Sequence, residues 1–201
     1  MIKNTNAKGT LFVISAPSGA GKTSLISALI EEMPNLIVSV SHTTRAPRPD
    51  EIDGVHYHFV TPGMYCQLEK QNIFLERASV FGHHYGTSRE WVETHLAKGF
   101  DILLEIDWQG ARQIKAQYKT SSVSIFILPP SLAILESRLR ARKQDSNEVI
   151  RYRMEKASAE IAHYPEYDYL VFNEDFDIAR RELKAIITAE RLRTGRQVIA
   201  L

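Results

Sequence analysis

The chain has 201 residues, of which 44% are apolar, so it is long enough for one α/β domain with a substantial core. Lys and Arg number 25 and Asp and Glu number 24, which gives a formal net charge of +1. This balance excludes the overall basic field of a protein that binds duplex nucleic acid. No run approaches the roughly 20 apolar residues that span a bilayer, so we expect neither nucleic acid nor membrane as a partner.

The N-terminal segment and the cysteine content bear on location. Residues 1–6 lack the apolar core of a signal peptide, and one cysteine, Cys66, permits no intramolecular disulfide. We therefore expect a cytoplasmic protein. Cys66 lies in a helical pattern and is expected to be an inert packing residue, because no cationic neighbour is evident. Oligomeric state stays open, with a homo-oligomer as one possibility.

A glycine-rich segment, A-P-S-G-A-G-K-T, follows the first predicted strand and leads into a helical pattern. Successive backbone N–H groups and a helix N-terminus in such a turn form a site for polyphosphate. Lys22 is predicted to reach the β- and γ-phosphates of a nucleoside triphosphate, and the Thr23 hydroxyl to ligate Mg²⁺. The candidate nucleotide-binding residues of this loop are Ala16, Pro17, Ser18, Gly19, Ala20, Gly21, Lys22 and Thr23.

The loop departs from the usual pattern G-x-x-x-x-G-K-[ST] at its first position, where Ala16 replaces glycine. A methyl group there narrows the turn without removing an N–H donor. The alternative interpretation is an ordinary strand-to-helix turn with an exposed lysine.

Short apolar runs alternate with helical patterns along most of the chain, which predicts a doubly wound α/β fold with a five-stranded parallel sheet. The predicted strands are Leu11 to Ile14, Leu36 to Val40, Ile102 to Ile106, Val123 to Leu128 and Tyr169 to Phe172. The predicted helices are Thr23 to Met33, Gln109 to Tyr118, Ser131 to Arg142, Asn147 to His163 and Asp177 to Thr194.

Residues 41–98 interrupt this alternation and are expected to form an inserted subdomain over the carboxyl ends of the strands, where a second substrate would meet the phosphate loop. Its first loop carries Arg45 and Arg48, and the prolines beside them disfavour helix. Two guanidinium groups three residues apart on a stiff loop suit a phosphate monoester. A solvated basic loop is the alternative.

Four segments together resemble guanylate kinase: S-H-T-T-R-A-P-R from Ser41, Y-G-T-S from Tyr85, I-D-W-Q-G from Ile106, and the loop at Ala16. The resemblance covers residues 9–189, leaving residues 190–201 as the end of the last helix and a tail. It implies a P-loop NTPase-type core, a GMP-binding insertion at about 41–98 and a helical lid at about 131–160. The implied activity is transfer of the γ-phosphoryl group of ATP to GMP, and also to dGMP, with Mg²⁺ as cofactor.

The resemblance also implies site residues. Arg45, Arg48, Tyr57 and Tyr85 would hold the GMP phosphate. Glu76 would accept hydrogen bonds from guanine N1–H and the 2-amino group, Ser41 and Thr87 would address O6, and Asp107 would support the base edge. Besides Lys22 and Arg45, the catalytic arginines would be Arg138, Arg142 and Arg153 of the lid, and Asn173 would contact adenine. Arginines on charged helices that merely face solvent, and an Asn173 that caps a helix, are the alternatives.

Two departures from the family's sequence affect these expectations. The lid reads A-R-K around Arg142 where the family has G-R-G, so the local turn is stiffer and the helix could run further. The third predicted strand ends E-I-D rather than D-I-D, which leaves the contribution of Glu105 to Mg²⁺ binding open. Two other functions are weighed: a non-catalytic interaction module, which typically lacks an intact phosphate loop, and a kinase for another phosphate ester, which would lack Ser41, Glu76 and Thr87.

Overall fold

A five-stranded parallel sheet forms the centre of the computed structural model, which describes residues 2–3, 8–141, 146–196 and 199–200. The strand order is β10-β9-β2-β8-β3, so the predicted doubly wound sheet is confirmed. The strands are β2 (Leu11–Ser15), β3 (Leu36–Val38), β8 (Asp101–Glu105), β9 (Ser122–Leu128) and β10 (Tyr169–Phe172). The second predicted strand was too long: after the Ser39 N–H bonds the Leu103 carbonyl at 3.0 Å, the chain leaves the sheet toward the insertion.

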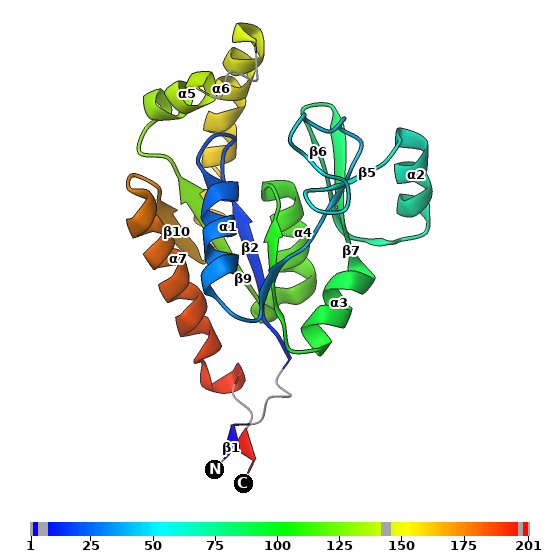
Figure 1. Cartoon of the computed structure of the whole chain (residues 1–201), viewed down its shortest axis with the longest axis vertical. Coiled ribbons are helices and arrows are strands. Elements are labelled where there is room, and N and C mark those ends of the chain that lie inside the picture. Colours follow the sequence, from blue (N-terminus) through cyan, green and yellow to red (C-terminus); the bar gives the residue numbers. More distant parts are fainter. Residues whose placement is uncertain (1, 4–7, 142–145, 197–198, 201) are drawn as a thin grey trace.

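Helices cover both faces of this sheet, as Figure 1 shows. Phe12 and Ile14 of β2 face α1 (Lys22–Glu32) and α7 (Phe176–Arg191), whereas Leu11 and Val13 face α3 (Arg89–Ala97) and α4 (Trp108–Tyr118). This is the side-chain alternation of a strand that is buried on both sides. Within the described residues, no helix combines the length and the apolar character needed to cross a membrane.

The insertion between β3 and β8 has its own four-stranded sheet, in the order β5-β4-β7-β6. Its elements are β4 (His42–Thr43), β5 (His58–Phe59), α2 (Pro62–Lys70), β6 (Phe74–Val80) and β7 (His83–Ser88), with α3 following. Helix α2 lies on its outer side, and Tyr65 is the one buried residue of that helix. Cys66 is therefore exposed, and the expectation that it packs in the interior was wrong.

Two helices, α5 (Leu132–Ala141) and α6 (Asn147–Ile161), occupy the region predicted to be the lid. Leu135 and Ala157 pack with Ala20 in a small apolar cluster, so these helices rest directly on the predicted phosphate loop. In Figure 1 the lid and the insertion stand at the same end of the central sheet as this loop. Arg142 lies outside the described residues. Short 3₁₀ helices occupy Lys119–Ser121, Tyr164–Glu166 and Thr194–Arg196.

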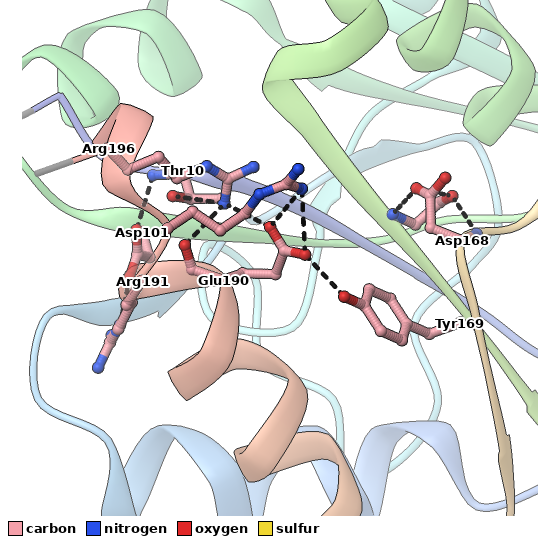
Figure 2. A network of polar contacts seen from close by, with 9 residues as sticks. Thr10, Asp101, Asp168, Tyr169, Glu190, Arg191 and Arg196 are labelled. Carbon is pink, nitrogen blue, oxygen red and sulfur yellow. Dashed lines mark hydrogen bonds and ion pairs between the residues drawn. The ribbon is translucent and has the colours of Figure 1, made fainter.

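The opposite end of the sheet is held by a polar network (Figure 2). The Asp101 carboxylate accepts from the Thr10 N–H and the Arg191 Nε, each at 2.6 Å. Glu190 is 4% exposed and accepts from the Tyr169 hydroxyl at 2.7 Å. Arg196 lies 3.2 Å from the same carboxylate. These contacts fix the end of α7 against the start of the sheet, close to where β1 (Ile2–Lys3) pairs with β11 (Ile199–Ala200).

We expect Glu190→Ala to lower the free energy of unfolding by about 2 kcal/mol, because it takes the carboxylate partner from the partly buried Tyr169 hydroxyl and Arg196 guanidinium and leaves a gap where the buried side chain stood. Glu182→Ala is the control, since Glu182 is exposed on the same helix and should change stability by less than about 0.5 kcal/mol. Denaturant unfolding followed by circular dichroism measures both. Equal stability of the two variants would show that the network contributes nothing.

Candidate functional site

One cavity of about 510 Å³ joins the phosphate loop, the insertion and the lid. Its lining includes most of the predicted site residues. They are Ala16, Pro17, Ser18, Gly19, Gly21, Lys22, Thr23, Ser41, Arg45, Arg48, Tyr57, Glu76, Tyr85, Asp107 and Arg153. Four predicted site residues that the structure describes are not part of this lining. Thr87 bonds Glu76, Asn173 bonds the Ala20 carbonyl, and Arg138 bonds the Asn173 carbonyl.

The phosphate loop owes its shape to glycines and to a support beneath it. Gly19 and Gly21 have φ values of 96° and 92°, a region that residues with a Cβ rarely adopt. Asn173 is buried at the end of β10 and donates from Nδ2 to the Ala20 carbonyl at 2.7 Å. A Cβ at Gly21 would collide with this amide. The alternative that Asn173 caps a helix is wrong, because Asp175 caps α7 by accepting from the Ile178 N–H at 2.9 Å.

The end of the loop that carries Lys22 and Thr23 faces the carboxylate of Glu105. The Thr23 hydroxyl donates to Glu105 Oε1 at 2.6 Å, and the Lys22 Nζ lies 3.7 Å from the same oxygen. Glu105 is the last residue of β8, so the parallel pairing of β2 with β8 brings it beside the loop. A hydroxyl and a carboxylate in contact are oxygen ligands of the kind that Mg²⁺ prefers, so these residues fit a magnesium ion held together with phosphates.

Two arginines and two tyrosines of the insertion, Arg45, Arg48, Tyr57 and Tyr85, also line the cavity. The Arg45 Cζ lies 5.4 Å from the centre of the Tyr57 ring, and the Tyr57 and Tyr85 rings are 5.9 Å apart. Burial raises the pKa of the Tyr57 phenol well above its usual value, so this hydroxyl stays a proton donor at neutral pH. The four side chains thus present several donors to one part of the cavity, as a phosphate requires.

A chain of hydrogen bonds runs from Ser41 to Glu76 between two strands of the insertion. Thr87 Oγ1 donates to Glu76 Oε1 at 2.6 Å and lies 3.0 Å from Ser41 Oγ. The ladder between β6 and β7 shifts register just before Glu76, which places Glu76 opposite Thr87. Glu76 is 2% exposed, so the alternative of a surface charge on a strand is wrong. Burial of the carboxyl, with the Asp107 carboxylate nearby, raises the pKa of Glu76 to about 7.

Asp107 and Gly110 shape the wall beside this carboxyl. Asp107 caps α4 and accepts from the N–H groups of Gln109 and Gly110, each at 3.1 Å. A Cβ at Gly110 would overlap Glu76 Oε2 and would also meet Ile106. Glycine at Gly110, the last residue of the I-D-W-Q-G segment, therefore leaves the space that the Glu76 carboxylate occupies.

Two arginines of the predicted lid, Arg153 on α6 and Arg138 on α5, form hydrogen bonds near the loop. Arg153 donates from Nη1 to Ser18 Oγ at 2.8 Å, and its Cζ lies 5.3 Å from the centre of the Phe81 ring. Phe81, in the turn between β6 and β7, also packs edge-on against Tyr152 at 5.7 Å. Helix α6 therefore bridges the phosphate loop and the insertion. Arg138 instead donates from Nη2 to the Asn173 carbonyl at 3.0 Å.

Glu160 is a site residue that sequence reasoning missed. It lies on α6, lines the cavity and accepts from the Ser18 N–H. Burial raises the pKa of Glu160, and Asp107 adds to the effect, whereas Lys22 and Arg153 oppose it. A single glutamate in a charged helix carries no sequence signal that would have identified it.

Comparison with known proteins accounts for this arrangement. A family model described as guanylate kinase matches residues 8–190. The chain belongs to the guanylate kinase family. Guanylate kinase of Vibrio cholerae is 58% identical over 192 residues, which cover 94% of this chain and 92% of that protein. The family resemblance expected from the four sequence segments is thereby confirmed.

Two further relatives agree with this assignment. Guanylate kinase of Aliivibrio fischeri is 56% identical over 193 residues, which cover 95% of this chain and 93% of that protein. The crystal structure of guanylate kinase from Anaplasma phagocytophilum superposes with a TM-score of 0.82 at 36% identity, covering 96% of this chain and 92% of that one. Both sequence and fold of this guanylate kinase family member thus match over nearly the whole chain.

We expect Gly110→Ala to raise the KM for GMP by about tenfold or more while leaving the KM for ATP within about twofold, because the added methyl displaces the Glu76 carboxylate. Ala111 lies next to it in α4, so Ala111→Gly is a control that perturbs the same helix without adding an atom near Glu76. Steady-state kinetics with each substrate varied in turn gives these values. A Gly110→Ala variant with an unchanged KM for GMP would show that the carboxylate position does not matter.

Proposed function

We propose that the cavity carries out the reaction of the guanylate kinase family, with ATP on the phosphate loop and GMP in the insertion. Family membership over residues 8–190 supports the ATP-dependent phosphorylation of GMP. The observation that carries the residue assignment is the shared cavity, because a γ-phosphate on the loop and a phosphate among the insertion's arginines would meet in it.

In the insertion, Glu76 accepts from guanine N1–H and the 2-amino group. Ser41 and Thr87 address O6: Ser41 donates to it, and Thr87, whose single hydroxyl proton goes to Glu76, lies 3.0 Å from Ser41 Oγ. Asp107 supports the base edge. Adenine lacks this pair of donors and the O6 acceptor, so it would leave a buried carboxylate unpaired. Sites of this type reject analogues that lack the matching group by on the order of 10⁴- to 10⁵-fold.

The phosphate of GMP is held by Arg45, Arg48, Tyr57 and Tyr85, and one of its oxygens is the nucleophile that attacks the γ-phosphorus of ATP. The bond from that phosphorus to the β–γ bridging oxygen breaks, and ADP leaves. Transfer of this kind depends on alignment and on positive charge at the equatorial oxygens. Lys22 and Arg153 supply that charge from the loop and the lid, with Arg138 and Arg142 as further predicted contributors.

Thr23, with Glu105 beside it, would hold Mg²⁺ together with the nucleotide phosphates, and the ion when bound neutralises charge on them. Arg138 and Asn173 also support the loop through the Asn173 and Ala20 carbonyls. Asn173 contacts adenine in addition to this supporting role.

A non-catalytic interaction module of the same fold is less consistent with the cavity. Lys22 and Thr23 both point to Glu105, and Arg153 reaches the phosphate loop. The near neighbours in sequence are named as kinases. Selection of guanine by Ser41, Glu76 and Thr87 likewise argues against a kinase for a different phosphate ester.

We expect a coupled ATP-consumption assay to show turnover with GMP and dGMP and less than about 10⁻³ of that rate with AMP, UMP or CMP. Lys22→Met should lower kcat by on the order of 10³-fold, because it removes the positive charge that Lys22 places beside the transferring phosphoryl group. The affinity for GMP should stay within about threefold of the unaltered value. Isothermal titration of GMP into the variant checks the second part. A folded chain that binds ATP and does not phosphorylate GMP would refute the proposed function.

A further inference from the structure

Glu51, in the loop after Arg45 and Arg48, bonds to both of these arginines and has no role in the site described above. Its Oε1 accepts from Arg45 Nη2 at 2.7 Å, and its Oε2 accepts from the Arg48 N–H at 2.8 Å. The side chains of Glu51 and Arg45 are 13% and 16% exposed, so this ion pair is largely shielded from solvent. A partly buried, charge-assisted pair is stronger than one on the open surface.

The carboxylate is also built into its own loop. The Glu51 N–H donates to the Arg48 carbonyl at 3.0 Å, while the Arg48 N–H donates back to the Glu51 side chain. Such reciprocal bonds close a turn in the manner of a capping box. Glu51 cannot swing away from Arg45 without leaving a backbone N–H of this turn unpaired.

These contacts fix the plane of one guanidinium group. Arg45 Nη1 donates to the Ala46 carbonyl at 2.7 Å and Nη2 donates to Glu51, so both terminal nitrogens are held. The described residues that line the cavity include Arg45 and Arg48 and do not include Glu51. Glu51 therefore contacts both arginines without itself lining the cavity.

We propose that Glu51 is a positioning residue for the 5′-phosphate of GMP, which holds Arg45 and the Arg48 backbone in the geometry that a phosphate monoester requires. This inference rests on the proposed function, because it assigns the phosphate site to Arg45 and Arg48. A planar guanidinium binds phosphate with two parallel hydrogen bonds only when its orientation is correct. The carboxylate also offsets part of the repulsion between two arginines three residues apart.

The charge state of Glu51 agrees with this role. Partial burial alone would raise the pKa of the Glu51 carboxyl, but the Arg45 guanidinium and the Arg48 N–H outweigh it and hold the pKa below its usual value. Glu51 is therefore ionised throughout the neutral range. Glu51 holds the Arg48 side chain less firmly than that of Arg45. The Arg48 Nη1 lies 3.8 Å from Glu51 Oε1, and the Arg48 side chain is 41% exposed.

A competing interpretation is that Glu51 stands in for the phosphate and is displaced when GMP binds. In that case removing its charge would tighten GMP binding. The positioning role predicts the opposite sign, so one titration separates the two.

The test compares GMP with guanosine as ligands of the complete chain and of Glu51→Gln, by isothermal titration calorimetry. We expect Glu51→Gln to weaken GMP binding about tenfold or more and to leave guanosine binding within about twofold, because guanosine has no phosphate for the arginines. Steady-state kinetics should show a similar rise in the KM for GMP, with the KM for ATP unchanged and kcat changed less. Asp50→Asn is the matched control, since it removes an exposed carboxylate from the same loop. It should leave the affinities for GMP and for guanosine unchanged.

Unchanged or tighter binding of GMP by Glu51→Gln would overturn the positioning role. An equal loss for GMP and guanosine would also overturn it, because that result indicates a general disturbance of the insertion. If the unaltered chain binds GMP no better than guanosine, the assignment of the phosphate site to Arg45 and Arg48 is wrong. That result contradicts the proposed function and is distinct from a result on Glu51→Gln, which contradicts only the role of Glu51.

Discussion

Burial of the Glu76 carboxyl is the constraint around which the insertion is built. A carboxyl that is 2% exposed is costly unless its oxygens find donors, and the Thr87 hydroxyl supplies one at 2.6 Å. The register shift in β6 brings these two residues opposite each other, and Gly110 leaves room for the second oxygen. Burial outweighs this bond and still raises the pKa of Glu76 to about 7, so one donor is too few to stabilise the ionised carboxyl in the free site. Guanine offers the two N–H donors that would stabilise the ionised form.

In both proposed phosphate sites, residues that do not line the cavity hold the loop that does. The Ala20 carbonyl of the nucleotide loop is held by Asn173, and the Asn173 carbonyl is held by Arg138. In the insertion, Glu51 holds Arg45 in the same indirect way. Groups that face the cavity are thus oriented by partners outside it, as preorganised charge requires. Helix α6 joins the two sites, because Arg153 bonds to Ser18 and stacks on Phe81.

The sequence predicted those features that depend on local order. The five parallel strands, the loop at residues 16–23 and the family were correctly predicted, because buried strands and glycine-rich turns leave patterns within a few residues. Features that depend on distant packing were missed. Glu160 and Glu190 are lone glutamates in helices, and only the folded chain shows that one lines the cavity and the other bonds Tyr169. The packing of Cys66 was predicted wrongly because helical periodicity does not say what lies against a helix.

Calorimetric titration of GMP, IMP and AMP into the unaltered chain and Glu76→Gln, at pH 8 and at pH 6, tests the role of the buried carboxyl most directly. We expect GMP to bind more tightly than IMP, which lacks the 2-amino group, and far more tightly than AMP. We also expect GMP affinity to fall about tenfold from pH 8 to pH 6, because a carboxyl with a pKa near 7 must then lose a proton to bind guanine. The preference for GMP over IMP and this pH dependence should be lost in Glu76→Gln, where any titration of the nucleotide phosphate remains as an internal reference. An unchanged preference over IMP and an unchanged pH dependence in Glu76→Gln would show that the Glu76 carboxyl does not read guanine.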